Sequence, residues 1–430
     1  MIQLPDRQHS ISRPLTVLIV AYRSADKLET CIASVEEYLP GHDVHVWDNS
    51  GSTHLDVRRL ADRMPHVHWH LGSENIGFAR AVNTLAAMLP DVDLLLLNPD
   101  AELIGPLTLT RAAINDPRTA AAAPMTSESD EHDRSASFLS RKHLPWDNAH
   151  RRPTLLNAIG GPLGVAERLR GTFLSNLFRS QPTSVDGYLT GACLAIRHEA
   201  WDSLGHFDEA FFMYGEEADW QRRAVEAGWR LRLEDEIAVR HRANGTVTGD
   251  SAGLRRSKDL QRAGVALQLE YRYGVRTAEL YLAAVSLCEG SKQRLRGRRG
   301  RGVAHPGVLV TVDGLHDPVT VTERLRVASE LASSGLAVTV VSLQGFGNLP
   351  QKLPTSVRLL RRPWWWPSTS PEDTPAILVS GTTKREKAFA RLFRTRRGRI
   401  CVDASAAIDS LVSVSPARSA SDSYHQVRGI

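Results

Sequence analysis

The stretch Leu94–Leu103, LLLLNPDAEL, decides the fold of this chain. Its unbroken run of leucines, Leu94 to Leu97, is typical of a strand that is buried on both faces of a parallel sheet. Pro99 cannot donate to a sheet ladder, so the strand must end there and deliver Asp100 at its carboxyl end. Open α/β sheets bind ligands at that edge. A carboxylate there, with Glu102 two residues on, suits a hard divalent cation that carries phosphate oxygens, although a plain Asn-Pro-Asp turn would use the same residues.

Strand and helix patterns alternate on both sides of this stretch. An apolar strand at Leu15–Tyr22 precedes a helical pattern at Leu28–Leu39, and a second strand follows at Val44–Trp47. This unit implies a parallel sheet with a right-handed crossover, and hence an α/β fold with its acidic loops along one edge. Further expected strands are Val67–Leu71, Leu189–Arg197, Trp229–Leu233 and Ile237–His241, and further expected helices are Ala79–Met88, His198–Leu204, Gly215–Ala227, Arg255–Tyr273 and Thr277–Cys288.

A second, smaller α/β pattern lies beyond a glycine- and arginine-rich segment, residues 291–302. Its expected strands are Val308–Val312, Ala337–Leu343, Ile377–Val379 and Ile400–Asp403, and its expected helices are Val321–Ser333 and Lys384–Phe393. This pattern predicts a small doubly wound, Rossmann-like domain. Removal of residues 303–430 is expected to leave donor hydrolysis or transfer measurable. The predicted organisation is an extension (1–14), a main domain with C-terminal helices (15–290), a basic linker (291–302), the small domain (303–403) and a Ser-rich tail (404–430), with variable surface structure at 126–182.

Composition narrows the class of protein. A length of 430 residues predicts two or three domains, and 42% hydrophobic with 23% charged residues is ordinary for a globular protein and excludes general disorder. No apolar run approaches the roughly 20 residues of a membrane span, and the N-terminus has no apolar signal core. The four cysteines are too far apart to pair as metal ligands. We therefore expect a cytoplasmic protein with reduced thiols.

Acidic residues gather where the helix at Gly215–Ala227 begins. Glu216, Glu217 and Asp219 complement the dipole of that helix, which alone could explain them. A carboxylate held near like charges also gains proton affinity, so one of the three could take a proton as a general base. The residues themselves leave open which of the three would do so.

Residues 15 to about 245 resemble a family 2 glycosyltransferase with the GT-A nucleotide-diphospho-sugar fold, and within it they are most similar to bacterial rhamnosyltransferase-like members. Five blocks carry the resemblance, in the family's order and spacing: VLIVAYRSADKLETCIASV, VHVWDNSGS, ENIGFARAVN, LLLLNPDAEL and DGYLTGACLAIRHEAWDSLGHFDEAFFMYGEEADWQRR. Each block alone is weak, but their order is specific. The pattern at Val308–Leu343 is similar to the first half of a GT-B domain, so the small domain is expected to be a non-catalytic appendage.

The resemblance implies an inverting, metal-dependent transfer of a sugar, such as L-rhamnose from dTDP-rhamnose, to a cell-surface glycan or lipid-linked acceptor. It implies Mn²⁺ or Mg²⁺ held by Asp100 and His241, and Glu217 as the base. Asp48 would accept the imide N–H of the nucleotide base. The other residues to which it gives a role are Glu216, Asp219 and Arg223 around the base, and Ala21, Tyr22, Asn49, Asn75, Gly77, Phe78, Asn83 and Asn98 around the donor.

Two departures from the family pattern affect these roles. The usual Asp-x-Asp is Asn98-Pro99-Asp100, so the metal rests mainly on Asp100, and Glu217 stands where relatives usually carry Asp. A nucleotidyltransferase is disfavoured because the loop after the first strand, residues 23–26, has no glycine. A degenerate glycan-binding protein is disfavoured because the acidic residues and His241 are all present. No nucleic-acid partner is expected, but the helix near 271–288 and the basic linker together resemble an interfacial membrane anchor.

Overall fold

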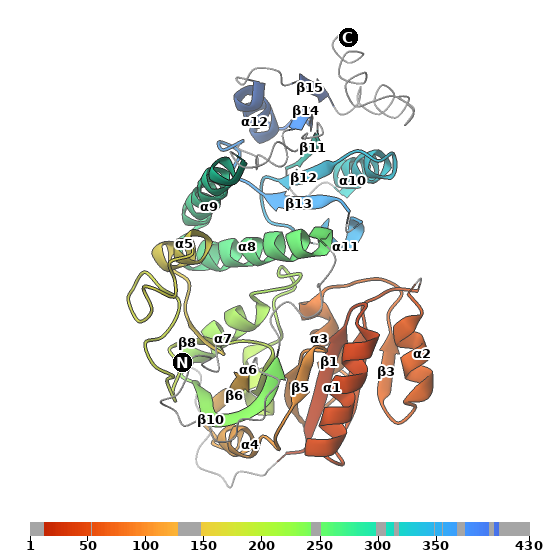
Figure 1. Ribbon diagram of the computed structural model, residues 1–430, viewed down its shortest axis with the longest axis vertical. Coiled ribbons are helices and arrows are strands. Elements are labelled where there is room, and N and C mark those ends of the chain that lie inside the picture. The colour runs from red at the N-terminus through yellow and green to blue at the C-terminus, as the bar shows by residue number, and fades with distance from the viewer. Residues whose placement is uncertain are drawn as a thin grey trace. The chain divides into compact units, whose positions relative to one another are not determined.

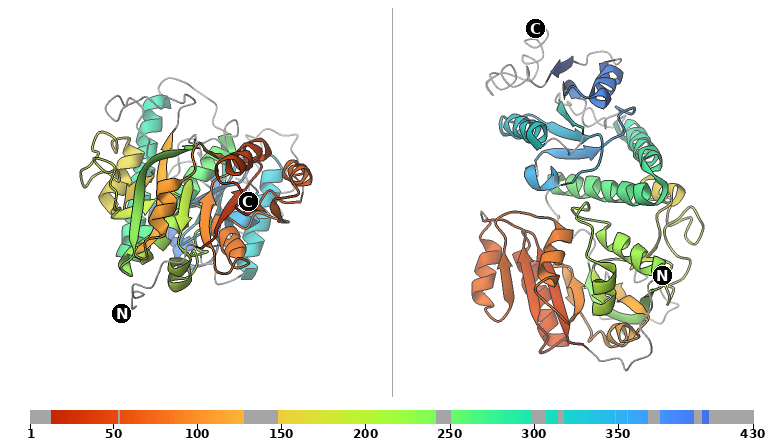
Figure 2. Two further views of the ribbon diagram at one scale, coloured as in Figure 1. Left: turned by 90° about the horizontal axis from the view of Figure 1, so that it is seen from below. Right: turned by 180° about the vertical axis from the view of Figure 1, so that it is seen from behind.

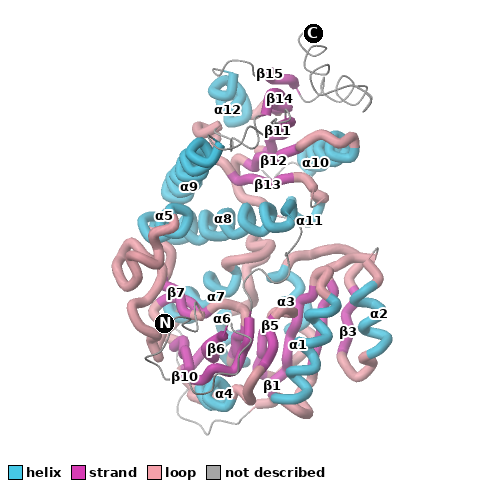
Figure 3. Tube along the Cα trace, viewed as in Figure 1, coloured by secondary structure: helices cyan, strands magenta, loops and turns pink. Residues whose placement is uncertain are grey.

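The chain forms two compact units, one of residues 1–153 and 166–248 and the other of residues 154–165 and 249–430. The sequence-based boundary at 290 differs from this division, because the helices after residue 250 belong to the second unit. Residues 1–12 of the predicted N-terminal extension, the whole Ser-rich tail and residues 298–302 of the predicted linker lie outside the described residues. The computed structural model (Figures 1–3) describes residues 13–52, 54–127, 148–241, 251–297, 307–313, 318–347, 349–354, 356–367, 375–394 and 400–403.

An eight-stranded sheet forms the centre of the first unit, with the strand order β3-β2-β1-β4-β9-β6-β10-β5. Strands β1 to β4 run parallel, as expected. The sheet is mixed rather than all-parallel, however, because β9 runs antiparallel to β4 and β6, and β5 runs antiparallel to β10. The strands are β1 (Leu15–Ala21), β2 (Val44–Asp48), β3 (His68–Leu71), β4 (Asp93–Leu97), β5 (Ala101–Leu103), β6 (Thr119–Ser127), β9 (Cys193–Ile196) and β10 (Arg230–His241).

Helices cover both faces of this sheet and bury two hydrophobic cores. Side chains from α1, α2 and α4 join the core on one face, and side chains from α3, α6 and α7 join the core on the other. The all-apolar strand β4 contributes to both cores, which is why its leucines are uninterrupted. The helices are α1 (Ala25–Tyr38), α2 (Asp56–Arg63), α3 (Phe78–Ala86), α4 (Thr108–Ile114), α6 (His198–Leu204) and α7 (Glu216–Glu226), and β7 (Ala149–Arg151) and β8 (Gly187–Leu189) form a separate pair.

Two strand predictions need correction. The strand expected at Leu189–Arg197 is two strands in different sheets, because Thr190 leaves the ladder and donates to the carbonyl of Asn148 at 2.7 Å. The two strands expected at Trp229–Leu233 and Ile237–His241 are one strand, β10, which stays paired with β6 through register shifts. The segment expected to be variable at 126–182 contains β7 and α5 (Leu155–Leu163), while its residues 128–147 lie outside the described part.

The second unit contains the predicted Rossmann-like domain. Its five strands are parallel in the order β13-β12-β11-β14-β15, which is the doubly wound order. Both the α/β class of the main domain and the small second sheet are thus confirmed. The elements are β11 (Gly307–Val312), α10 (Pro318–Ser333), β12 (Val338–Ser342), α11 (Leu349–Lys352), β13 (Arg358–Arg361), β14 (Pro375–Ser380), α12 (Lys384–Arg394), β15 (Ile400–Asp403), α8 (Ser251–Tyr273) and α9 (Val275–Gly297).

Charged contacts tie α8 to this small sheet. The buried Asp259 accepts hydrogen bonds from Arg262 at 3.2 Å and from Arg358 at 2.9 Å. The buried Arg256 donates to the carbonyls of Val357 at 2.8 Å and Pro350 at 3.0 Å. Helix α9 then continues to Gly297, into the segment predicted to be a linker. The helices and the sheet are therefore one body.

Removing residues 303–430 is expected to destabilise the remaining chain rather than release a separable domain, because Arg256 and Asp259 would lose their partners on and next to β13. We expect the apparent Tm of the shortened protein to fall by at least about 5 °C. Circular dichroism during heating measures this. An unchanged Tm and unchanged helix content would show that α8 and α9 need no sheet, and a substitution in the tail beyond residue 404 serves as the control.

Candidate functional site

The two predicted metal ligands lie next to each other in the structure. Because β5 pairs antiparallel with β10 and sets Ala101 opposite His241, the residue before β5, Asp100, meets the His241 imidazole. The Nε2 atom of His241 lies 3.3 Å from Oδ1 of Asp100, and the two side chains are 24% and 9% exposed. The neighbouring acid, Glu102, instead pairs with Arg240 at 2.7 Å. The site therefore presents one carboxylate and one imidazole.

These two residues fit a divalent cation that receives its other ligands from elsewhere. A carboxylate oxygen with an imidazole nitrogen suits Mn²⁺, and carboxylates with phosphate oxygens and waters suit Mg²⁺. Over the described part of the chain, no group of three or more His, Cys, Asp and Glu side chains is arranged to hold a metal. The chain would thus supply Asp100 and His241, and the rest of the coordination shell would have to come from a bound diphosphate and water.

The turn before Asp100 is built by the backbone of Asn98. Its N–H donates to the carbonyl of Ala192 at 3.0 Å, and its carbonyl accepts from Ala101 at 3.0 Å. The Cys31 thiol also approaches this carbonyl, at 3.5 Å, and burial raises the pKa of that thiol. Cys31 is therefore an uncharged core residue beneath the turn, as expected of a reduced thiol.

Asp48, at the end of β2, carries an unpaired buried oxygen. Its side chain is completely buried, and Oδ1 accepts from the backbone N–H of Ser50 at 2.8 Å. Oδ2 has no hydrogen-bond partner among the described residues. Leaving a buried acceptor unpaired is costly, so this oxygen is suited to accept an N–H group from a ligand. That is the role which the sequence predicts for Asp48.

The first βα loop lies beside Asp48. Ser50, two residues after it, accepts through Oγ from the backbone N–H of Arg23 at 2.8 Å, and the Ala21 carbonyl accepts from the N–H of Asn49 at 2.8 Å. The guanidinium of Arg23 sits 4.9 Å from the ring centroid of the half-buried Tyr22. The predicted donor residues Ala21 and Tyr22 thus border Asp48. Arg23, to which the sequence analysis assigned no role, lies beside them.

Two asparagines predicted to contact the donor, Asn49 and Asn75, form hydrogen bonds within the protein. The amide of Asn49 donates to the carbonyl of Gly77 at 3.0 Å, and its oxygen accepts from Trp47 and from Ile76, both at 3.1 Å. Asn75 accepts from the N–H of Gly77 at 2.9 Å. Both side chains therefore hold the loop that leads into α3.

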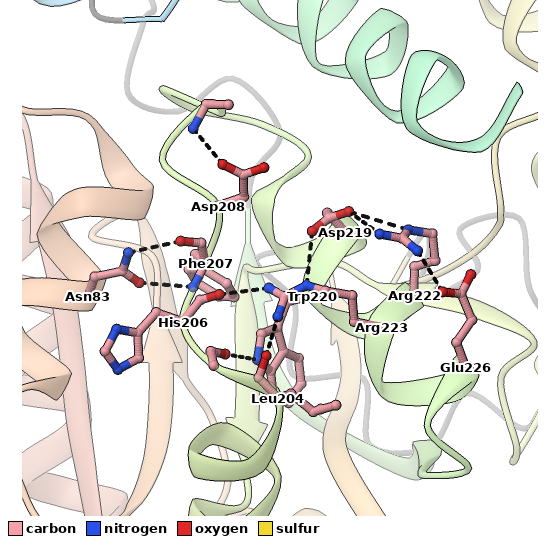
Figure 4. Close-up of polar contacts among 12 residues, drawn as sticks. Asn83, Leu204, His206, Phe207, Asp208, Asp219, Trp220, Arg222, Arg223 and Glu226 are labelled. Carbon is pink, nitrogen blue, oxygen red and sulfur yellow. Dashed lines mark hydrogen bonds and ion pairs between the residues drawn. The ribbon is translucent and has the colours of Figure 1, made fainter. Parts of the chain in front are cut away.

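The start of α3 is joined to the segment before α7. Gly77 has φ +89°, and a Cβ there would lie 2.5 Å from the carbonyl oxygen of Phe212, which accepts from the N–H of Phe78 at 2.8 Å. Asn83 bonds to both backbone groups of Phe207, donating at 2.9 Å and accepting at 3.0 Å (Figure 4). The start of α3 is therefore connected to the segment before α7 through Gly77, Phe78 and Asn83.

Two of the three acidic residues in the first turn of α7, Glu216 and Glu217, have a raised pKa. Burial, and then the charge of Glu217, raise the pKa of Glu216 well above its ordinary value, and Oε2 of Glu216 has no partner among the described residues. Burial likewise raises the pKa of the half-buried Glu217, which accepts from the N–H of Gly215 at 3.1 Å. Its Cγ lies 3.9 Å from where a Cβ on Gly191 would stand, so the lack of a side chain there leaves room beside this carboxylate.

The third acid is fully engaged by arginines. Asp219 is buried and accepts from Arg222 at 2.8 Å and from Arg223 at 3.1 Å. Arg223 also donates to the carbonyls of Leu204 at 2.5 Å and His206 at 2.7 Å (Figure 4). Asp219 and Arg223 are therefore placed to support the site, and Glu217 is the acid of this turn that remains partly accessible.

Gln221 is a supporting residue that sequence reasoning missed. It is completely buried, and its amide binds both backbone groups of Leu189, each at 2.8 Å. This fixes the end of β8 just before Gly191, against which Glu217 lies. The sequence does contain a feature that could have indicated this role. Gln221 follows Glu217 by four residues and therefore lies on the same face of the helix.

A scan against protein-family models finds no match. The N-acetylglucosaminyl-diphospho-decaprenol L-rhamnosyltransferases of two Mycobacterium tuberculosis strains are each 27% identical to this chain over 251 residues, which cover 54% of this chain and 77% of the relative.

Solved structures also match. The mannosyltransferase PcManGT from Pyrobaculum calidifontis, in complex with GDP-Man and Mn²⁺, matches 68% of this chain and 77% of its own, with 15% identity and a TM-score of 0.39. Residues 1–349 of TarS from S. aureus match 73% of this chain and 79% of their own, with 13% identity and a TM-score of 0.35.

The chain is a glycosyltransferase with a mixed α/β main domain. It is of the family 2 type and is related to the mycobacterial L-rhamnosyltransferases. The family resemblance predicted from the five sequence blocks is thereby confirmed, whereas the donor, the acceptor and the individual roles of the site residues are matters of proposal.

Proposed function

We propose that this glycosyltransferase moves a deoxyhexose such as L-rhamnose, with inversion, from a nucleoside diphosphate to a lipid-linked or cell-surface glycan acceptor. The names of the mycobacterial relatives, which act on a decaprenol-linked acceptor, support this choice of sugar and acceptor. The observation that carries the reaction class is the meeting of Asp100 and His241 at the carboxyl edge of the sheet. The enzyme would act in the cytoplasm without nucleic acid.

Asp100 and His241 would hold Mn²⁺ or Mg²⁺ together with the diphosphate of the donor. When bound, the cation neutralises the negative charge that develops on the departing diphosphate. The chain contributes a rigid pair of ligands for this purpose, because each residue is fixed at the end of a paired strand. Strand-borne ligands need little reorganisation when the donor binds.

Glu217 would take the proton from the acceptor hydroxyl. The raised pKa of its carboxyl makes it a stronger base than an exposed glutamate. Glu216, buried beside it with an unpaired oxygen, would remain protonated and so spare the site a second negative charge. Asp219 cannot replace Glu217 without breaking its contacts with two arginines.

Asp48 would select the nucleotide base through its unpaired Oδ2. Asp48→Asn is expected to weaken nucleoside diphosphate binding about 10- to 100-fold, because an amide N–H₂ facing an imide N–H loses a charge-assisted bond of about 1.5–3 kcal/mol. Calorimetric titration of UDP, dTDP and GDP, each with and without Mn²⁺, measures this and identifies the base.

The control for Asp48→Asn is Asp56→Asn, an exposed acid on α2 whose side chain is 78% exposed. This substitution removes the same charge from the same unit and is expected to leave binding unchanged. If Asp48→Asn binds each of the three nucleotides as tightly as the wild-type protein does, the proposed role of Asp48 is wrong. No binding of any of them to the wild-type protein would contradict the proposed function itself.

A further inference from the structure

Three histidines and a tryptophan share one face of the main sheet at its open edge. Strand β3 ends the described sheet and pairs there with β2 alone (Figure 1). In the register of these two strands, His45 lies opposite His68, and Trp47 lies opposite His70. Alternate residues of a strand point to opposite faces, and Val46 joins the core on the other face. The three imidazoles are therefore directed away from that core.

The imidazoles of His45 and His70 face each other through one nitrogen each. Nδ1 of His45 lies 3.3 Å from Nε2 of His70. The exposed His68 stacks on the ring of His45, with ring centroids 4.4 Å apart. On the other side, Trp47 lies parallel to His70, with centroids 6.4 Å apart. Both rings of the pair are thus held between neighbours, yet both residues are only half-buried and remain open to solvent.

Both imidazoles of the pair are uncharged at neutral pH. Burial, and then the charges of His68 and His70, lower the pKa of His45 to about 4. Burial, and then the charge of His68, also lower the pKa of His70. Neutral imidazole is the form that binds metals, so protons compete little for these nitrogens at pH 7. Asp43, two residues before His45, has the opposite effect on the pKa of His45 and favours a cation nearby.

The distance between the two nitrogens matches that between two ligands of one metal ion. Nitrogen ligands lie about 2.0–2.1 Å from a tetrahedral zinc ion, which sets two of them about 3.3–3.4 Å apart. The nitrogens of His45 and His70 already have this separation. One of them carries the hydrogen of the present hydrogen bond, and a change of tautomer moves it to the other nitrogen of the same ring. Both lone pairs are then available to an ion.

We propose that His45 and His70 form a binding site for a divalent transition-metal ion such as Zn²⁺ or Ni²⁺. Imidazole suits these ions, whereas Mg²⁺ prefers carboxylate, carbonyl and water oxygens. No third ligating side chain completes the site within the part of the chain that the structure describes, so water fills the rest of the coordination shell. The site is independent of the proposed function, because it uses neither Asp100 nor His241.

A metal at this position fastens the edge strand to the sheet. Strand β3 is joined to β2 over only four residue pairs. Directly after β3, the N–H of Gly72 donates to the carbonyl of Asp48 at 3.1 Å. An ion bound to His45 on one strand and to His70 on the other bridges both strands, so bound metal should make local opening of β3 less frequent.

Calorimetric titration of the full chain with Zn²⁺ and with Ni²⁺ tests this proposal. The Asp100→Asn variant is the background, because it lacks one ligand of the proposed catalytic metal. We expect this variant to bind a single ion of either metal. His70→Gln in the same background should weaken that binding at least about tenfold, since losing even an indirect partner of a metal ligand typically costs about 10- to 100-fold in affinity.

The matched control is His66→Gln in the same background. His66 is a histidine of the same unit whose side chain is 59% exposed and whose imidazole contacts Glu36. Its replacement should leave metal binding unchanged. Glutamine at position 70 can still form a hydrogen bond with His45, so circular dichroism should show the fold of His70→Gln to be intact.

Amide hydrogen exchange provides a second readout that is confined to the site. Ni²⁺ should slow the exchange of residues 68–71 in the Asp100→Asn background, and should have no such effect once His70→Gln is added. Exchange at 68–71 that Ni²⁺ leaves unchanged in the background protein would show that the ion does not join the two strands, and the proposal would be wrong.

Two further results would overturn the proposal. One is that neither Zn²⁺ nor Ni²⁺ binds to the Asp100→Asn protein. The other is that His66→Gln weakens binding as much as His70→Gln does, because the ions would then bind surface histidines without preference. Nucleotide titration of the wild-type protein reports on the donor site separately, so failure of the proposed function is distinguished from failure of this inference.

Discussion

Glu217→Gln is expected to remove about 99% or more of the transfer activity while nucleotide-sugar binding stays nearly intact. The amide has the shape of the carboxylate and can still accept from the N–H of Gly215, so the start of α7 stays assembled. It cannot take the proton of the acceptor hydroxyl, a function worth roughly 10²–10⁴ in rate. Single-turnover transfer with saturating donor measures the chemical step, and calorimetric titration measures binding.

Neighbouring acids provide the matched controls for this experiment. Glu216→Gln should cost much less, because Glu216 is buried and holds its proton in our scheme. Asp219→Asn should lower the stability of the protein along with its rate, since it breaks the contacts with Arg222 and Arg223. Glu217→Asp should keep part of the activity. If Glu217→Gln turns over at nearly the wild-type rate, Glu217 is not the base.

The pH profile gives an independent check on Glu217. Because burial raises the pKa of its carboxyl, the base becomes protonated at a pH above the ordinary range of glutamate. The transfer rate should therefore fall as pH decreases through that raised pKa, and should be full above it. If the residual activity of Glu217→Gln falls at low pH in the same way as the wild-type rate does, the group that titrates is not Glu217.

Asp100→Asn is the second substitution with a large expected effect. It should reduce Mn²⁺-dependent nucleotide binding at least about tenfold, toward the affinity measured without metal, because it removes the charged ligand that faces His241. Metal-free nucleotide binding through Asp48 should be unaffected. Titrations with and without Mn²⁺ on wild type and variant give the four affinities required.

The neighbouring acid Glu102 is a suitable control for Asp100. Glu102→Gln removes the same charge two residues away, yet its carboxylate is paired with Arg240 rather than directed at His241. It should therefore leave the effect of Mn²⁺ on nucleotide affinity intact. A loss of metal dependence in Glu102→Gln as large as that in Asp100→Asn would show that net charge, rather than ligation by Asp100, controls metal binding.

The strands that the sequence could predict are those with large apolar residues. The β4 leucines pack into both cores, and their type alone indicates a doubly covered strand. Strand β6 was missed because its alanines, Ala120 to Ala123, have little strand propensity. They occupy the sheet between β9 and β10, buried on both faces, where they join both cores. Small side chains are needed at these positions because helices pack on both faces of β6. This reason lies in the packing and cannot be read from the residue types alone.

The sequence could predict which residues belong to the candidate site, but not which of them touch one another. The pairing of Asp100 with His241 depends on β5 turning back antiparallel to β10, which joins residues far apart in the sequence. The resemblance suggested that both residues matter, but the residues alone did not show that they touch. For Asn49 and Asn83, an amide can bind a ligand or the protein, and here both amides bond to backbone groups that residue type alone does not indicate.

The insertion of α5 has a consequence for the order of events on the ribosome. Residues 154–165 belong to the second unit but are made before its other helices, since the chain returns to complete the first unit before α8 begins. The partners of α5 in α9 include Val285, about 120 residues later. At ordinary rates of synthesis, α5 waits on the order of ten seconds for them. During that interval its leucines are exposed, so slow translation between α5 and α9 should increase the dependence of this protein on chaperones.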